Sequence, residues 1–198
     1  MSSTSTQPGI GKQPRICKPL PEAEVVYSRW IAHLDAEFTR HQNIDRRSEI
    51  VRDELHQLFL GRPHGGKLNF TLDTELPFNV LELTLDPRNI TFEAECYDDV
   101  DAELYALRKP LLWFWRMFDR SPVGLNHWVG VRLRSMLGHH IFRHMGRGVN
   151  ICHNVTFTFG YNLILEDNCH VRSNVLLDDR SELIVPSGAV VAESFPRR

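Results

Sequence analysis

Histidines are the side chains of this sequence best suited to acid–base chemistry near neutral pH, and the chain has ten of them. His139, His140 and His144 form an HHxxxH spacing, which on a helix would place His140 and His144 on one face. No acidic residue or cysteine stands close to them in the sequence to complete a set of metal ligands. We therefore interpret these histidines as surface or interface residues and expect no metal.

His170 is a candidate general base, because it lies within a repeated segment and directly follows Cys169. Its position in the repeat is expected to face outward, so it can act as a base only where a groove forms beside it. Cys152 and Cys169 are interpreted as buried apolar side chains rather than nucleophiles. The sequence contains no GxGxxG, P-loop, GxSxG or HExxH motif.

Charge is distributed unevenly along the chain, although the formal net charge is only −2. Residues 71–103 hold ten acids and one base, whereas residues 106–150 hold eight bases and one acid. Either the two segments neutralise each other, or the basic segment faces an anionic surface or cofactor. The aromatic and basic stretch from Trp113 to Trp128 leaves peripheral membrane contact as a further alternative. No nucleic-acid partner is expected.

Most of the chain before the repeat is predicted to be helical. Residues 1–20, rich in Ser, Thr, Gln, Gly and Pro, are expected to be a disordered tail. Residues 21–140 are expected to form a mainly α-helical region, because apolar residues recur there at spacings of three and four. Within it, the alternating segment 67–97 predicts short strands or an extended arm. Helices are expected over 98–107 and again from Pro110.

A six-residue period marks residues 141–195. Apolar residues open successive blocks at Phe159, Leu165, Val171 and Leu177, with two-residue insertions before Phe159 and near Ser181. The fourth positions of the blocks are Asn154, Asn162, Asn168, Asn174, Arg180 and Gly188. Asn and Gly tolerate left-handed backbone angles and suit tight corners. This pattern predicts a β-solenoid after the helical region, and hence an α+β chain.

The repeat resembles the hexapeptide-repeat acyltransferases, and most closely the galactoside and maltose O-acetyltransferase group. Those enzymes carry a run of the form V-x-F-S-Y-G-x-N-I-x-I-G-x-N, and this chain reads VTFTFGYNLILEDN over residues 155–168. The family continues into N-x-N-L-x-I and a paired D-D, where this chain reads RSNVLLDD over residues 172–179, one residue shorter. The resemblance covers about 40 residues, and implies a short left-handed parallel β-helix with triangular coils.

The resemblance also implies an activity and a set of binding residues. It implies transfer of an acyl group, usually acetyl, from acetyl-CoA or another acyl-CoA to a hydroxyl of a sugar or similar small acceptor. The family works as homotrimers, with active sites in the grooves between neighbouring solenoids. Asp178 and Asp179 match the paired acids that contact the acceptor, and Asn174 matches the second family asparagine. Arg172 stands where the family has its first asparagine.

One element of the family's chemistry has no counterpart in this sequence. In the family the catalytic His lies in a loop well beyond the D-D pair, but the sequence after Asp179 contains no His. We interpret the sequence as the front part of such an enzyme, and His170 is the substitute base it offers. The alternative is a non-catalytic trimeric solenoid that acts as a scaffold or interaction protein.

The expected location is the cytoplasm. The four cysteines show no paired spacing, and the first nine residues have no apolar core of a signal peptide. No run of about 20 apolar residues that could span a membrane is present in the sequence.

Overall fold

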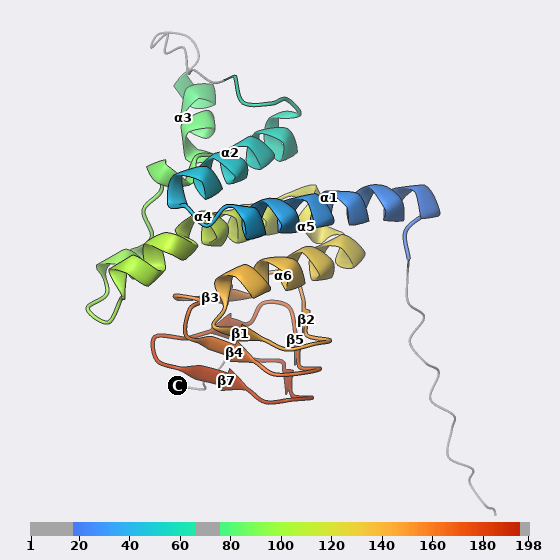
Figure 1. The fold of residues 1–198 in the computed structure, drawn as a ribbon, viewed down its shortest axis with the longest axis vertical. Helices are drawn as coiled ribbons and strands as arrows, with labels where there is room; N and C mark the ends of the chain where they lie inside the picture. Colours follow the sequence, from blue (N-terminus) through green and yellow to red (C-terminus); the bar gives the residue numbers. More distant parts are fainter. Residues whose placement is uncertain (1–17, 66–75, 195–198) are drawn as a thin grey trace, which may run out of the picture.

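The computed structural model describes residues 18–65 and 76–194, which form a helical layer and a coil of short strands (Figure 1). The helical layer spans residues 21–141, and the coil spans residues 144–191. The predicted α+β class, with a helical region before the strands, is confirmed. The expectations for residues 1–17 and 66–75 lie outside the described residues.

The helical layer begins with α1 (Pro21–Arg40) and α2 (Ile44–Leu60). Pro21 opens α1, where its missing N–H and fixed φ cost nothing. Asn43 begins α2 because its side chain accepts the backbone N–H groups of Asp45 and Arg46, at 2.9 and 3.2 Å. Gly61 ends α2 with a φ of 65°, a backbone angle that glycine adopts without strain.

Residues 76–97 are helical, so the prediction of strands or an extended arm is wrong for the described part of 67–97. They form α3 (Leu76–Thr84) and two 3-10 turns, η1 (Pro87–Asn89) and η2 (Glu93–Cys96). The Asp86 side chain begins η1 by accepting the Arg88 N–H at 3.0 Å. The Glu95 side chain accepts the Phe92 N–H at 2.8 Å at the start of η2. A short alternation of apolar residues cannot exclude a helix, and here local caps favour one.

The rest of the layer consists of α4 (Ala102–Asp119), α5 (Pro122–Leu125) and α6 (His127–Ile141). The expectation of two helices separated before Pro110 is wrong, because α4 runs through this residue. Pro110 is buried in the core, and its packing offsets the missing backbone hydrogen bond. Asp101 begins the helix by accepting the Leu104 N–H at 2.9 Å, so residues 98–101 precede it.

The coil, over the residues that the structure describes, is built from eight short strands in three small parallel sheets. The first sheet contains β1 (His144–Met145), β4 (Leu163–Leu165) and β7 (Leu183–Val185). The second contains β2 (Asn150–Ile151), β5 (His170–Val171) and β8 (Val190–Val191). The third contains β3 (Thr156–Phe157) and β6 (Leu176–Leu177). The chain therefore visits the three sheets in turn before it returns to the first.

Each strand pairs with the strand that lies one turn further along the chain, as Met145 does with Leu165 and Phe157 with Leu177. One turn is therefore longer than three hexapeptides, because each turn also contains one two-residue insertion. The insertion follows the third strand of a turn, so Phe159 lies in a corner and Phe157 faces inward from β3. The expected block start at Phe159 is thus shifted by two residues, although both side chains are buried.

Left-handed backbone angles occur at most of the predicted corner positions. Asn154, Asn168 and Asn174 have φ values of 58°, 59° and 64°, and Gly188 has 71°. Asn162 and Arg180 do not share this conformation, because they belong to the longer corners; Gly160, with φ 82°, takes the role in the first of these. Asparagine is the residue besides glycine that adopts this region at least cost, which explains its recurrence.

Helix α6 lies across the top of the coil, and α4 lies beside it (Figure 1). Trp115 of α4 donates its Nε1–H to the Val155 carbonyl at 2.9 Å. Its ring packs against those of Phe142 and Phe157, with centroids 5.8 and 5.1 Å away. At Gly138 of α6, an added Cβ would lie only 2.4 Å from the Met145 sulfur. The two parts therefore share one continuous hydrophobic core.

Candidate functional site

A cleft of about 370 Å³ lies between the helical layer and the third sheet of the coil. One wall comes from η2 and α4, and the other comes from β3, β6 and the corners that precede and follow them. The polar and charged residues that line it are Glu93, Tyr97, Arg116, Asp119, Arg120, Asn154, Thr156, Thr158, Asp178 and Arg180. A concave site with several convergent polar groups is the default place to look for ligand binding.

Asp178 is the predicted site residue that reaches this cleft. Its carboxylate pairs with Arg180, with Oδ1 3.0 Å from Nε and Oδ2 3.1 Å from an Nη. The Thr158 hydroxyl donates to Oδ1 at 3.3 Å. The carboxylate is held in a fixed orientation at the cleft wall, where it can accept a hydrogen bond from a ligand hydroxyl.

Asp179, the adjacent acid, faces the opposite way into the corner of the coil. Its side chain is fully buried and accepts the backbone N–H groups of Thr158 at 2.9 Å, Phe159 at 2.8 Å and Gly160 at 2.6 Å. Burial raises the pKa of this carboxyl, and the three N–H groups act against that shift. In this position Asp179 supports the corner and does not touch the cleft.

Residues 155–168 and the adjacent acids Asp178 and Asp179 therefore meet in one corner of the coil. Asp179 accepts from three consecutive residues of the 155–168 run, and Asn162 of the same run donates to the Asp179 carbonyl at 3.0 Å. Phe159 and Tyr161 stack there with ring centroids 5.2 Å apart. The Tyr161 hydroxyl accepts the Asp101 N–H at 2.8 Å, which joins the corner to the start of α4.

Asn174, Arg172 and His170 lie away from the cleft wall. Asn174 occupies the corner between β5 and β6, and its Oδ1 accepts the Asn154 amide at 2.9 Å. Arg172 is exposed just beyond β5. Of the predicted site residues, Asp178 therefore lines the cleft, and Asn174 contacts Asn154, which also lines it. His170 lies in the second sheet, and Arg172 lies just beyond it.

His170 lies with its Nε2 3.7 Å from the Cys152 sulfur. Burial, with a smaller effect of Arg172, lowers the pKa of His170, so its imidazole is neutral near pH 7. Burial raises the pKa of Cys152, and raises that of Cys169 to about 11. Both thiols therefore stay protonated. Cys169 is buried as predicted, whereas Cys152 is only half-buried.

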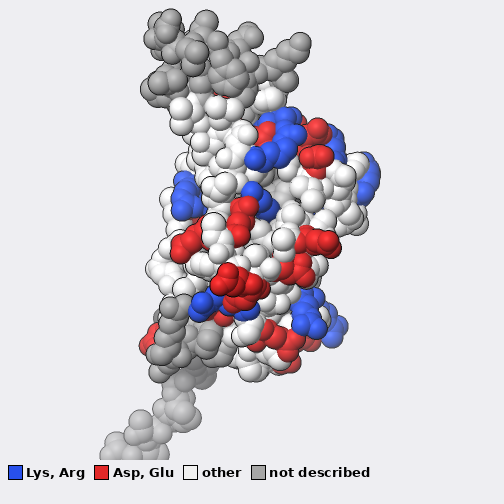
Figure 2. Space-filling model, turned by 90° about the vertical axis from the view of Figure 1, so that its left-hand side faces the viewer, with Lys and Arg blue, Asp and Glu red and all other residues white. Residues whose placement is uncertain are grey.

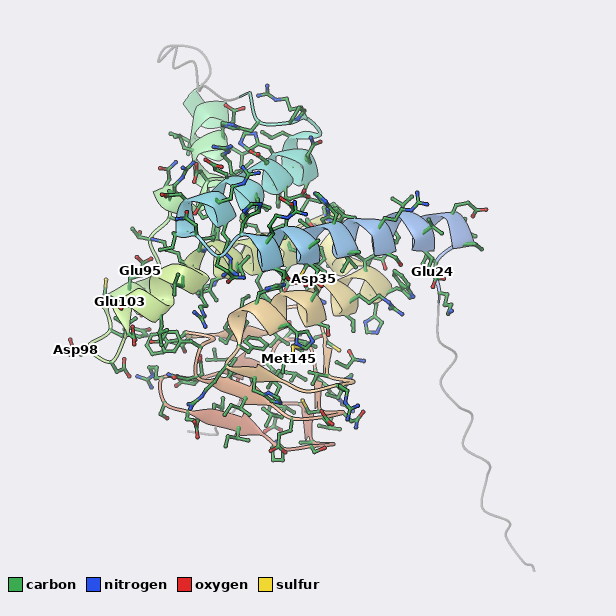
Figure 3. The ribbon with its side chains drawn as sticks, viewed as in Figure 1. Glu24, Asp35, Glu95, Asp98, Glu103 and Met145 are labelled. Atoms are coloured by element: carbon green, nitrogen blue, oxygen red, sulfur yellow. The ribbon has the colours of Figure 1, made fainter. Side chains whose placement is uncertain are left out.

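The HHxxxH spacing does not place its histidines on one helix. His139 and His140 belong to α6, but His144 lies in β1. His140 pairs with Asp35 of α1 at 2.8 Å, and Figure 3 shows Asp35 between α1 and α6. Over residues 18–65 and 76–194, no group of three or more His, Cys, Asp or Glu side chains is arranged to hold a metal ion.

The arginines of the cleft were not among the site residues predicted from the sequence. Arg116 lies in the last turn of α4 and Arg120 caps its C-terminus, and both line the same wall. Two features of the sequence could have identified these arginines as site residues: their spacing and the dense positive charge of residues 106–150. Lys109 pairs with Glu95 at 3.0 Å, and this is the only ion pair between the acidic and basic segments in the described part of the chain. Figure 2, which views the molecule from the left-hand side of Figure 1, shows acidic and basic side chains interspersed on that face.

Asp119, at the end of α4, connects the cleft to the core. It forms a buried ion pair with Arg134 of α6, with Oδ1 2.7 Å from Nε, and its Oδ2 accepts the Asn154 N–H at 3.0 Å. Its carboxylate is thereby occupied on both oxygens by groups of the protein. Asp119 is a positioning residue, because it holds α4, α6 and a corner of the coil together.

Comparison with known proteins identified no matching family model, no curated relative and no similar solved structure. No helix within the described residues is both long enough and apolar enough to span a bilayer.

Proposed function

We propose that this chain is a hexapeptide-repeat protein of the acyltransferase type, whose coil is a left-handed parallel β-helix. In this proposal it transfers an acyl group from acetyl-CoA or another acyl-CoA to a hydroxyl of a sugar-like acceptor held in the cleft. Asp178 accepts a hydrogen bond from the acceptor. The active assembly is a homotrimer in which a neighbouring solenoid completes the groove.

The observation that carries the proposal is the corner where residues 155–168 meet the paired acids. These two stretches carry the likeness to the acyltransferases, and they lie on successive turns of the coil, where β3 pairs with β6. Asp179 binds three backbone N–H groups of the run, and this fixes the neighbouring Asp178 at the cleft wall. The coil brings together any two residues one turn apart, so the support lies in Asp178 lining the cleft, where the resemblance expects an acid that binds the acceptor.

Acyl transfer requires more than an acceptor site. The acceptor hydroxyl attacks the thioester carbonyl, the C–S bond breaks, and the thiol of CoA leaves. A general base must take the hydroxyl proton, and histidine suits this step near neutral pH. No histidine lines the cleft among the described residues. In the proposed trimer a histidine base would therefore come from outside the residues that line this cleft.

Thiol release from acetyl-CoA, measured with a panel of sugar and sugar-phosphate acceptors, tests the proposal. We expect acceptor-dependent release that falls about 10-fold or more in Asp178→Asn, because the amide loses a charged acceptor. Glu182→Gln is the matched control: it removes an exposed coil carboxylate that pairs with Arg143 outside the cleft. Loss of release in His170→Ala, with Asp178→Asn active, would move the site to the second sheet and contradict the proposal.

A non-catalytic trimeric scaffold is the second candidate. It is favoured by the absence of a histidine among the described residues of the cleft, and by exposed apolar side chains at the far end of the coil. Ile184 and Val190 on the last two strands are 44% and 60% exposed. A stable trimer by native mass spectrometry, with neither thiol release nor CoA binding, would favour the scaffold over the enzyme.

A further inference from the structure

The cleft is lined by three arginines and three carboxylates, and two of these arginines lie outside the ion pairs of the described residues. Asp178 pairs with Arg180, and Asp119 pairs with Arg134 from outside the cleft. Arg116 and Arg120 have no ion pair with any acid in the described part of the chain. The remaining cleft acid, Glu93, receives the Tyr97 hydroxyl at 3.1 Å.

Arg116 is the more informative of the two arginines. It is half-buried, and its guanidinium lies over the Phe92 ring, 4.3 Å from the ring centre. Burial lowers the pKa of Arg116, with no carboxylate within the described residues to act against the shift. The contact with Phe92 offsets only part of the cost of removing a cation from water. A half-buried cation without an acid partner therefore favours the binding of an anion.

Arg120, the residue that caps the C-terminus of α4, adds a second guanidinium. It is exposed, and one Nη donates to the Arg116 carbonyl at 2.8 Å, which holds its side chain along the helix toward Arg116. A guanidinium has five N–H donors, so most of the donors of Arg120 remain available. Two guanidinium groups at one wall fit a phosphate dianion better than they fit a single carboxylate, because the phosphate carries more charge and more acceptor oxygens.

The opposite wall supplies a different chemistry. Asp178 accepts hydrogen bonds but cannot donate them when ionised, so it suits a hydroxyl. Thr158 and Thr156 add hydroxyl groups nearby. At the helical wall, a molecule that spans the cleft would thus meet Arg116 and Arg120 together with Glu93. At the coil wall it would meet Asp178 and its partner Arg180. A cleft of about 370 Å³ is large enough for a monosaccharide-sized ligand.

We infer that the acceptor bound in this cleft is a phosphorylated small molecule, a phosphomonoester that also carries hydroxyl groups. Arg116 and Arg120 bind the phosphate, and Asp178 accepts a hydrogen bond from a hydroxyl. This inference rests on the proposed function for the role of the cleft as the acceptor site, but binding can be measured without acyl transfer. It adds a substrate class and two binding residues to the proposed site.

Calorimetric titration of the full chain with glucose 6-phosphate, and in parallel with glucose and inorganic phosphate, tests the inference. Glucose 6-phosphate serves as the probe because it combines a phosphate with sugar hydroxyls. We expect it to bind more tightly than either parent compound, and to bind about 10-fold more weakly in Arg116→Gln and in Arg120→Gln. Arg116→Lys should give an intermediate loss, because it keeps the charge and loses the planar fork.

Arg132→Gln is the matched control. Arg132 is a guanidinium that lies over an aromatic ring, that of Trp128, 3.7 Å from its centre, and it does not line the cleft. Its variant should bind the probe as the unsubstituted chain does. Thermal unfolding of each variant separates a lost contact from a lost fold, because the Arg116 variants should keep the unfolding midpoint of the Arg132 variant within a few degrees.

Three results of the binding measurements would overturn the inference. The first is equal binding of glucose and glucose 6-phosphate; the second is binding that does not change in Arg116→Gln. The third is binding of CoA that depends on both arginines with no binding of the sugar phosphate, which would assign the phosphate to the acyl donor. Arginine-dependent binding without thiol release would support the inference and contradict the proposed function. Thiol release with neutral acceptors only would support the proposed function and contradict the inference.

Discussion

The helical layer and the coil differ in how many polar side chains they bury. Among the described residues, the helical layer has five fully or almost fully buried polar side chains, Arg47, Ser48, His56, Ser121 and Arg134, whereas the coil has one, Asp179. In the coil, alternate residues of each short strand face outward, so polar side chains reach solvent without special partners. The layer has no repeat, and its buried groups depend on individual contacts, several of them with residues nearby in the chain.

The individual contacts of the layer are specific. Arg47 donates to the carbonyls of His41 at 2.9 Å and Phe38 at 3.2 Å, and to the Gln42 side chain at 2.5 Å. Arg134 binds both Asp119 and the Gly124 carbonyl, the latter at 2.9 Å. Removal of Arg134 would leave the Asp119 carboxylate without its cation. The comparison therefore predicts larger losses of stability from the helical layer than from the coil.

The largest effect is expected at Arg134. Arg134→Ala leaves the Asp119 carboxylate without its cation, and should lower the free energy of unfolding by about 3–5 kcal/mol. Urea denaturation followed by circular dichroism measures this loss. Arg143→Ala is the control, because its ion pair with Glu182 is exposed and should contribute less than about 1 kcal/mol. Similar losses in both variants would contradict the contrast between layer and coil.

A smaller effect is expected at the buried acid of the coil. Asp179→Asn keeps an oxygen for two of the three backbone N–H groups but turns an amide N–H₂ toward the third. One buried donor is then unpaired, at a cost of about 1–3 kcal/mol. The same denaturation experiment, with Glu182→Gln as the exposed control, measures it. A loss above that of Arg134→Ala would reverse the proposed order of the two regions.

The corner asparagines should matter still less individually. Asn174→Ala places a less tolerant residue at a φ of 64° and should cost about 1–2 kcal/mol. Asn174→Gly relieves the backbone strain and removes only the hydrogen bond to Asn154, so its cost should be smaller. The difference between the two variants measures the backbone contribution. Equal losses would show that the side-chain bond, rather than φ, stabilises the corner.

The smallest effect is a pH dependence that arises in the helical layer. His56 is buried, neither ring nitrogen has a hydrogen-bond partner within the described residues, and burial lowers its pKa below the usual 6.5. The unfolded chain therefore takes up a proton near pH 6.5 while the folded chain does not. Stability should fall as the pH drops below this value, by no more than about 1.4 kcal/mol per pH unit for one proton.

His56→Leu tests this dependence, because it removes the titrating group and leaves no unpaired atom behind. The variant should lose less stability between about pH 6.5 and 5 than the unsubstituted chain. His144→Gln, at an exposed position of β1, is the control and should leave the slope unchanged. An unchanged slope in His56→Leu would show that other groups of the molecule set the acid sensitivity.

The strand positions of the coil could be predicted from the sequence because each of its contacts repeats. Leu165, Val171 and Leu177 were predicted to open successive blocks of the repeat, and each is fully buried. Asn154, Asn168, Asn174 and Gly188 were expected at left-handed corners and are found there. Phe159 was placed two residues out of register, because a two-residue insertion can be assigned to several positions of a long apolar stretch.

The helical layer was harder to predict. Its helices could be recognised from apolar spacing, but the described part of 67–97 was mistaken for extended chain and α4 was divided at Pro110. In both places the outcome depends on capping side chains and on burial against residues far away in sequence. Single-residue contacts of this kind leave no periodic signal.

The candidate site shows the same division. The pair Asp178 and Asp179 could be singled out by likeness, but the sequence could not assign one to the cleft and the other to the interior. The sequence by itself determined the coil, because its contacts recur at every turn and each turn repeats the same information. Only the tertiary structure decided that Arg116 and Arg120 face a cleft without acid partners among the described residues, since pairing of charges depends on which distant side chains come within reach.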